Sequence, residues 1–434
     1  MKMVDLQGAG LSMLSRMAQS ELIDSLKLRK PFEKLLYRGS KAGFQVIGAT
    51  ARAFKSTDKK PRERLPAPVR TDLFDLNLTN EQQMIRESVQ RFAAEVLYPL
   101  AHKSDEAVSL PADLRAQAAE LGLAYYAVPE AMGGAASEQS VVTQMLAAED
   151  LAHGDFSLAA AILAPISVAN ALTRWGTAEQ QSRYLPAFAS EQAPVASIAV
   201  NEATPLFNPY KLSTTAKRSG DGFVLNGEKS LVLCGADAEL VLVAAMLDDK
   251  PALFIVEGGS EGMRWMSDEA MGLKATGTMK LRLDNLTLPA DALLGDQDFD
   301  YQQLLDFGYL AWCALAVGTA QAVLDYVIPY CNDRVAFGEP ISHRQGVAFM
   351  IADLAVEIDS MRMLTWNAAS LAEAGKPFHR EAYLARLLCA EKSMQIGTNG
   401  VQLLGGHGFT KEHPVERWYR DLRFVAIAHG GLHL

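Results

Sequence analysis

The stretch that decides the fold is Val401-Gln402-Leu403-Leu404-Gly405-Gly406-His407-Gly408-Phe409. It places two adjacent glycines after an apolar run, where backbone amides can approach an anion closely. Upstream lie Asp333-Arg334-Val335-Ala336-Phe337-Gly338 and Ser342-His343-Arg344-Gln345, and downstream lies Glu416-Arg417-Trp418-Tyr419-Arg420-Asp421. The first of these blocks brings an arginine, whose fork of donors suits a pyrophosphate. A Gly-Gly pair alone is usually a turn, so the indication comes from all four blocks taken together.

In this order and spacing, the four blocks resemble the C-terminal domain of the acyl-CoA dehydrogenases, flavin enzymes that desaturate acyl thioesters. That family holds FAD across a subunit interface: one subunit's middle domain holds the isoalloxazine ring, and the neighbour's C-terminal domain holds the ADP half. The resemblance therefore implies FAD as cofactor and a homodimer, a tetramer or a hetero-oligomer. By the same resemblance, the ADP half is bound by six residues: Arg334, Phe337, Gln345, Gln402, Gly405 and Gly406.

The resemblance covers about residues 78–434 and implies an α+β fold of three domains. These are an α-helical N-domain at 78–192, a middle β-barrel or β-sandwich domain at 193–297 and a C-terminal four-helix bundle at 298–434. Residues 1–77 have no counterpart in the shorter family members and form a basic amphipathic extension with a linker.

The periodicity of apolar residues predicts the elements within this frame. Thr79 and Gln82 have the spacing of a capping box at the start of a helix. Further helices are expected at 111–121, 301–332, 344–374 and 379–404. Strands are expected at 223–229, entering a turn, and at 240–243, 253–256 and 279–288.

Composition limits the classes of protein. The chain has 434 residues, 49% hydrophobic and 21% charged, which is enough for two or three domains with real cores. The chain has 41 Lys and Arg and 51 Asp and Glu. Residues 1–70 are basic, with 15 Lys and Arg against 6 Asp and Glu, and the remainder is acidic, with 26 Lys and Arg against 45 Asp and Glu. The acidic body argues against nucleic acid as a partner, because phosphate binding needs a basic surface.

Two apolar and basic stretches within residues 1–56 have the composition of amphipathic helices on an anionic membrane surface. Packing of their apolar face on the protein body is the alternative, and both stay open. No signal peptide or membrane span is expected, so the cytoplasm is the default location. The four cysteines lie far apart in the sequence and are expected to be buried in a reducing compartment.

The part that would hold the flavin ring departs from the family. The family pattern Thr-Glu-Pro with a following Gly-Ser-Asp corresponds here to Asn201-Glu202-Ala203-Thr204-Pro205-Leu206-Phe207, in which only Glu202 matches. In the next block, Leu231 stands for a tryptophan that packs on the flavin, and Leu233 for a threonine that hydrogen-bonds near N5. Apolar packing is therefore kept, while a polar flavin atom needs backbone or water instead.

The catalytic base is the second departure. The family usually carries Tyr-Glu-Gly-Thr, and its glutamate removes the α-proton of the thioester while its backbone N–H polarises the carbonyl. Here the sequence reads Ile427-Ala428-His429-Gly430-Gly431, so His429 takes that place as the candidate base. A neutral imidazole is a competent base near pH 7, although a residue so near the C-terminus is expected to be loosely held. The other family position for the base aligns with Gly308, and Asp306 should face away from it on a helix.

The remaining polar residues of this region are expected to be structural. His343, His407 and His413 fall in helix starts or turns of the family pattern. Glu416, Arg417, Arg420 and Asp421 are typical of an ion-paired helix that aligns the base, and such a network also explains them without catalysis.

Three hypotheses for function remain. The first is an oxidoreductase of lipid and fatty acid metabolism, an FAD-dependent acyl-CoA dehydrogenase that passes electrons to an electron-transfer flavoprotein. The second is a catalytically silent partner subunit that completes the FAD site of another dehydrogenase. The third is a related flavin reaction on a CoA thioester that needs no carboxylate base.

Overall fold

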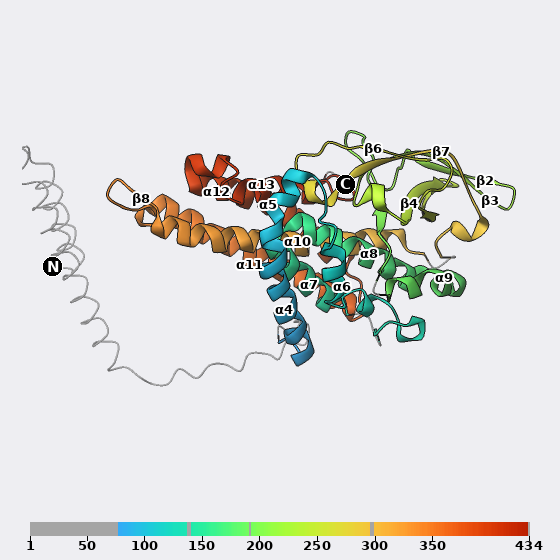
Figure 1. The fold of residues 1–434 in the computed structure, drawn as a ribbon, viewed down its shortest axis with the longest axis horizontal. Coiled ribbons are helices and arrows are strands. Elements are labelled where there is room, and N and C mark those ends of the chain that lie inside the picture. Colours follow the sequence, from blue (N-terminus) through green and yellow to red (C-terminus); the bar gives the residue numbers. More distant parts are fainter. Residues whose placement is uncertain (1–76, 137–139, 191, 296–298, 433–434) are drawn as a thin grey trace, which may run out of the picture. The chain divides into compact units, whose positions relative to one another are not determined.

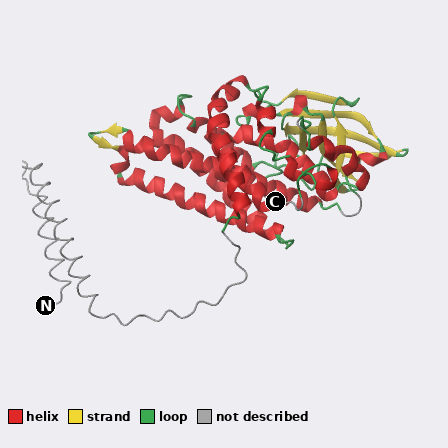
Figure 2. Cartoon of the chain, turned by 60° about the horizontal axis from the view of Figure 1, so that its bottom comes forward, coloured by secondary structure: helices red, strands yellow, loops and turns green. Residues whose placement is uncertain are grey.

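The computed structural model describes residues 77–136, 140–190, 192–295 and 299–432. Helices precede and follow a seven-stranded β-sheet, and the strands of that sheet gather at one end of the described body (Figures 1 and 2). The basic stretches within residues 1–56, with their expected membrane contact, lie outside the described residues.

The longer helices are α4 (Asn80–Phe92), α5 (Tyr98–Ala107), α6 (Leu114–Ala119), α7 (Val141–Gly154), α8 (Phe156–Trp175), α9 (Ala178–Phe188), α10 (Tyr301–Asp333), α11 (Gln345–Glu373), α12 (His379–Leu404) and α13 (Val415–Leu422). The strands are β1 (Ala196–Ala199), β2 (Thr215–Ser219), β3 (Gly222–Val232), β4 (Leu240–Leu247), β5 (Lys250–Glu257), β6 (Met263–Ser267), β7 (Met279–Leu288), β8 (Val335–Ala336) and β9 (Glu339–Pro340).

The N-terminal helices begin at side chains that cap them. Thr79 and Gln82 form the predicted capping box of α4, with the Gln82 N–H donating to Thr79 Oγ1 at 3.1 Å. Asp155 ends α7 and caps α8, because its Oδ1 accepts the Leu158 N–H at 2.9 Å. These caps fix where α4 and α8 begin, and residues of both helices line the cavity described below.

The C-terminal helices match the predicted ranges to within one residue. α10 is mostly buried and packs on α7, α11 and α12 in one helical core. Among the described residues, two helices, α8 and α10, are long and apolar enough to cross a membrane, but 72% of each apolar window is buried inside the protein. Both are therefore core helices of the bundle.

The middle domain is a curled sheet in the order β1-β4-β2-β3-β7-β6, with β5 paired to β4. The pairs β1–β4 and β2–β4 are parallel, and β4–β5, β2–β3, β3–β7 and β6–β7 are antiparallel. β4 is almost entirely buried, so it reads as a continuous apolar run. One of its faces (Leu240, Leu242, Ala244) packs in a core with α8 and the start of α10, and the other packs inside the sheet.

β3 corrects one expectation. The sequence predicts a turn after Lys229, whereas β3 continues to Val232 through two irregularities in its pairing with β7. The strand continues because Val232 still pairs with Met279 of β7. Before it, the Lys229 side chain is fully buried and pairs with Glu202 at 2.9 Å. Glu202 also accepts backbone N–H groups of Ser213 and Thr214 at 2.7 and 2.9 Å. This buried pair ties β3 to the segment that follows β1.

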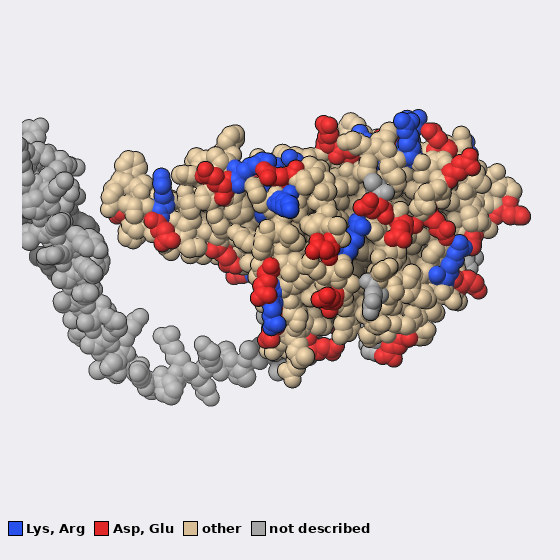
Figure 3. All heavy atoms as spheres, in the orientation of Figure 1, with Lys and Arg blue, Asp and Glu red and all other residues tan. Residues whose placement is uncertain are grey.

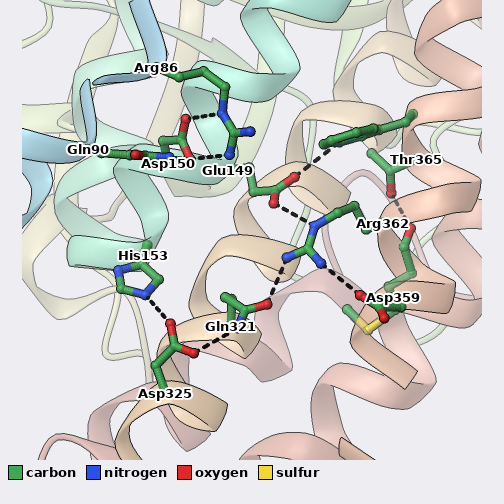
Figure 4. A network of polar contacts seen from close by, with 12 residues as sticks. Arg86, Gln90, Glu149, Asp150, His153, Gln321, Asp325, Asp359, Arg362 and Thr365 are labelled. Carbon is green, nitrogen blue, oxygen red and sulfur yellow. Dashed lines mark hydrogen bonds and ion pairs between the residues drawn. The ribbon is translucent and has the colours of Figure 1, made fainter. Parts of the chain in front are cut away.

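The outer side of α7 is held by a polar network (Figure 4). Arg86 of α4 binds both carboxylate oxygens of Asp150, at 2.7 and 2.8 Å. Arg362 of α11 donates to Glu149 at 2.8 Å and to Gln321 at 2.9 Å. α7 is thereby fixed against α4, α10 and α11.

All four cysteines are buried thiols, as expected. Desolvation raises the pKa of Cys234 to about 11. On the face drawn in Figure 3, acidic and basic side chains are interspersed over the helical part of the chain.

Candidate active site

A cavity of about 460 Å³ lies between α7, α8, α10 and the sheet. This volume is in the range of sites that enclose a small molecule. Small apolar side chains make up much of its helical wall: Ala147, Ala148, Ala160, Ala164 and Ala311. Residues of both departures from the family pattern also line it: Asn201, Leu231, Leu233, Gly308 and His429.

His429 is firmly held, contrary to the loose terminus expected from its sequence position. Its backbone has a positive φ of 54°, and three bonds fix it there. The His429 N–H donates to Asn201 Oδ1 at 2.8 Å, and Asn201 Nδ2 donates to the Ile427 carbonyl at 3.2 Å. The Tyr309 hydroxyl donates to the His429 carbonyl at 3.1 Å. Side chains of α10 and of the segment after β1 thus hold the loop that carries His429.

Gly308 and His429, the two positions where the family resemblance places a base, are in contact. A Cβ added at Gly308 would lie 2.4 Å from both Cε1 and Nδ1 of His429. The imidazole therefore occupies the space above the helix where a side chain of residue 308 would stand. One ring fills both positions, and α10 needs glycine there to admit it.

The surroundings of His429 keep its imidazole neutral. Burial, with the positive charge of Arg386 as a second cause, lowers the pKa of His429 to about 4. Nδ1 is buried without a hydrogen-bond partner among the described residues. Arg386 of α12 donates to the Ala428 and Gly430 carbonyls on both sides of the histidine, and its guanidinium lies 4.1 Å from the centre of the Tyr309 ring. The site therefore combines a neutral acceptor nitrogen with a fixed positive charge.

The part of the cavity wall expected to contact the flavin ring contains Leu231 and Leu233 and is apolar. Its backbone and side-chain polar groups form hydrogen bonds within the protein. Leu231 adopts a positive φ of 53° and donates its N–H to Asp268 Oδ2 at 2.7 Å. The Ser230 hydroxyl donates to the same oxygen at 2.7 Å. Asp268 was missed from sequence, since it belongs to no quoted motif. Asn201 begins the quoted Asn201-Glu202 block, but its hydrogen bonds to the His429 loop were not predicted. Leu231 and Leu233 offer apolar packing to a planar ring, which fits the isoalloxazine.

The six residues expected to bind the ADP half lie at the opposite end of α10. Arg334 follows its last residue, and the β8–β9 hairpin that follows carries Phe337, which is 96% exposed. Gln345 begins α11, and Gln402, Gly405 and Gly406 end α12. Tyr330, near the end of α10, donates to the Leu404 carbonyl at 3.4 Å and joins the two groups. No heavy atom lies within 4 Å of a Cβ built at either glycine, so their backbone is open to a ligand.

Within one chain, the two halves of the expected flavin site are far apart. Gly308 and Arg334 are 26 residues apart on α10 and its C-cap, which is roughly 39 Å at the rise of an α-helix. The residues present fit FAD only when the ring half of one chain meets the ADP half of another, as the resemblance implies.

The other polar residues of this region hold structure. Asp306 turns toward α12 and binds His379 at 2.9 Å. Arg417 pairs with Asp155 at 2.9 Å and Arg420 with Asp105 at 2.7 Å, and these buried pairs anchor α13. Burial and the nearby Asp155 raise the pKa of Asp421 to about 7. His343 lies 3.6 Å from Glu339, and the Tyr330 and Tyr326 hydroxyls bond His407 and His413.

Comparison with known families gives three matches in chain order. They are the N-terminal domain of acyl-CoA dehydrogenase at residues 79–192, its middle domain at 197–286 and its C-terminal domain at 301–432. The short-chain specific acyl-CoA dehydrogenase of Bos taurus is 32% identical, over 82% of this chain and 88% of its own length. A probable acyl-CoA dehydrogenase of Bacillus subtilis is 34% identical, over 82% of this chain and 96% of its own length.

Solved structures agree with these matches. A chain from work on the electron transferring flavoprotein of Acidaminococcus fermentans has a TM-score of 0.77 and 31% identity, over 83% of this chain and 97% of that one. A Mycobacterium smegmatis glutaryl-CoA dehydrogenase in complex with FADH2 has a TM-score of 0.75 and 25% identity, over 82% and 92%. Fold and site together define a flavin-dependent oxidoreductase of α–β–α architecture. The chain belongs to the acyl-CoA dehydrogenase family, as its first quoted motifs indicated.

Proposed function

We propose that the chain desaturates an acyl-CoA thioester between Cα and Cβ with FAD, that His429 takes the proton, and that an electron-transfer flavoprotein receives the electrons. Family membership supports the reaction class. The observation that carries the particular assignment is the neutral His429 imidazole, which lines the cavity at the position of the family's base.

FAD would be held by two chains. Arg334, the hairpin around Phe337 and the glycines after α12 would hold the ADP half, while Leu231 and Leu233 of the neighbour would pack on the ring. When bound, FAD supplies the acceptor for the hydride that leaves Cβ. Every other step falls to this chain's own side chains.

His429 accepts the α-proton in this proposal. The imidazole is free base at pH 7, since the pKa lies near 4. An imidazole whose conjugate acid has so low a pKa is a weak base, so the free energy of proton transfer to it is less favourable. Arg386 would offset this, because the positive charge that acts on His429 through space would also favour the enolate that forms as the proton leaves. The same charge that weakens the base therefore favours the transition state.

The thioester carbonyl needs a donor as well. The His429 N–H is the donor that the family would use, and here it is bonded to Asn201 Oδ1 at 2.8 Å. A bound thioester oxygen would have to replace that amide oxygen. Asn201 would then keep its bond to the Ile427 carbonyl and continue to position the loop.

This occupied donor also favours the second hypothesis, a catalytically silent partner subunit. A chain that only completes a neighbour's site would keep the open ADP end and could leave its own donor satisfied. Such a chain would co-purify with another dehydrogenase, whereas an enzyme would turn over alone.

The test is the visible spectrum of the purified holoprotein during anaerobic addition of acyl-CoAs of different chain class. Bleaching of the flavin by one class is expected. His429→Gln should slow the bleaching by about 10²–10⁴-fold, the usual contribution of a general base. His429→Glu should retain it, because Arg386 stabilises a carboxylate at that place. Gly308→Ala should slow it like His429→Gln, since the added Cβ displaces the ring.

His102, an exposed residue of α5, gives the matched control His102→Gln, which should bleach like the natural protein. Unchanged bleaching in His429→Gln would remove the histidine from the mechanism. A flavin that stays oxidised with every acyl class would favour the silent partner.

A further inference from the structure

The cavity wall where α7 and α8 face each other is polar, unlike the alanine-lined wall near it. The side-chain amides of Gln144 and Asn170 bond each other in both directions, at 3.2 and 2.9 Å. Both residues are half-buried and line the cavity. An amide pair that faces a purely aliphatic ligand loses contact with water and gains nothing in return. Its presence therefore suggests a ligand that offers it a hydrogen bond.

Gln144 has capacity for such a bond. A side-chain amide carries two N–H donors and two acceptor lone pairs. The contacts with Asn170 use one donor and one lone pair of Gln144, and the described residues form no other bond with that side chain. The remaining N–H and lone pair suit a hydroxyl, which accepts and donates, or a carbonyl, which accepts.

The polar wall continues to α4 and α11. Gln82 Nε2 donates to Thr143 Oγ1 at 3.3 Å, and the Thr143 hydroxyl donates to Ser140 Oγ at 2.8 Å. Ser140 in turn donates to Glu373 Oε2 at 2.8 Å. All four residues line the same cavity. Its polar end thus carries a carboxylate, which repels a second carboxylate and accepts hydroxyl donors.

We propose that the substrate's acyl group carries a neutral hydroxyl or carbonyl oxygen remote from the thioester, and that Gln144 recognises it. This inference rests on the proposed function, because the same cavity holds the acyl group. A plain alkyl chain leaves the Gln144 amide without that bond, and a chain that ends in a carboxylate meets the negative charge of Glu373. The wide, alanine-lined part of the wall gives room for a group bulkier than a linear chain.

The experiment measures equilibrium binding of non-reactive CoA thioethers to the FAD-loaded protein by calorimetry. One series carries alkyl groups, a second carries a hydroxyl moved stepwise along chains of equal length, and a third ends in a carboxylate. At least one hydroxyalkyl thioether should bind ten-fold or more tightly than its alkyl counterpart, and the carboxyalkyl series should bind most weakly. Gln144→Met, of similar volume, should abolish the hydroxyl preference while alkyl binding stays equal or improves.

Equal affinity of the alkyl and hydroxyalkyl series in the natural protein overturns the proposal, as does a preference that survives Gln144→Met. Absence of binding by every thioether also counts against it. Ser197 lines the cavity elsewhere, so Ser197→Ala serves as a control that should keep the preference. Flavin bleaching by plain acyl-CoAs is measured separately. Bleaching without a preference for the hydroxyl series would support the proposed dehydrogenase activity and contradict the role of Gln144. A hydroxyl preference without bleaching would support the role of Gln144 and contradict the dehydrogenase activity.

Discussion

At the residue scale, the sequence locates His429 but not its surroundings. The absence of the family's glutamate can be read directly, and so can Gly308 at the alternative position. The contact between them cannot, because it joins α10 to a loop 121 positions later. The same holds for Asn201 and Arg386, whose hydrogen bonds to the loop come from distant elements. The sequence position predicts a loosely held histidine, and tertiary contacts decide against this expectation.

The buried imidazole should make stability depend on pH. Its folded pKa of about 4 lies below the usual 6.5, so the unfolded chain takes up the proton first as pH falls. The contribution is complete above pH 6.5 and is lost as pH falls toward 4. Between pH 7.5 and 5.0 the natural protein should lose up to roughly 2 kcal/mol more than His429→Leu. Urea unfolding at both pH values, with FAD in constant excess, measures this.

His102→Leu should lose as much stability between these pH values as the natural protein. An equal loss in His429→Leu would show that the imidazole is not buried as described.

At the element scale, long and strongly periodic helices were predictable, and irregular segments were not. α10, α11 and α12 begin and end within a residue of the predicted ranges because each repeats its apolar face over many turns. The helix expected at 111–121 is shorter, Leu114–Ala119, since residues at either end form turns. The pairing of Val232 with Met279 of β7 and the buried Lys229–Glu202 pair both join segments distant in sequence, so no local pattern shows them. Within the ring-side wall, the carboxylate of Asp268 was likewise invisible from sequence.

α13 offers a test of how the catalytic loop is held. Arg417 and Asp155 form a buried pair, so Arg417→Leu would leave a buried carboxylate without its cation and should cost about 3–5 kcal/mol. Arg183→Leu breaks a pair that is half-exposed at both partners and should cost under about 1 kcal/mol. Urea unfolding of both variants gives the comparison. Similar costs would mean that the pair in α13 is not a buried anchor.

At the scale of the whole molecule, the residues proposed to hold the two halves of FAD lie toward opposite ends of α10. If two chains share each FAD, an Arg334→Ala chain and a His429→Gln chain should complement each other. Their mixed dimer contains one site with both defects and one with neither, so it should recover about half of the natural activity. Co-expression with two different tags and sequential purification isolates it. Mixed dimers no more active than the better parent would place each site within a single chain.

The indole of Trp312 lies beside the cavity, with its ring centre 6.4 Å from that of His429 and 4.6 Å from that of Phe424. The chain therefore carries its own optical reporter of that compartment. Light emitted by this indole depends on what occupies the neighbouring space and on whether the adjacent imidazole is charged. Occupancy of the compartment can thus be followed by fluorescence without a label, even for ligands that never react.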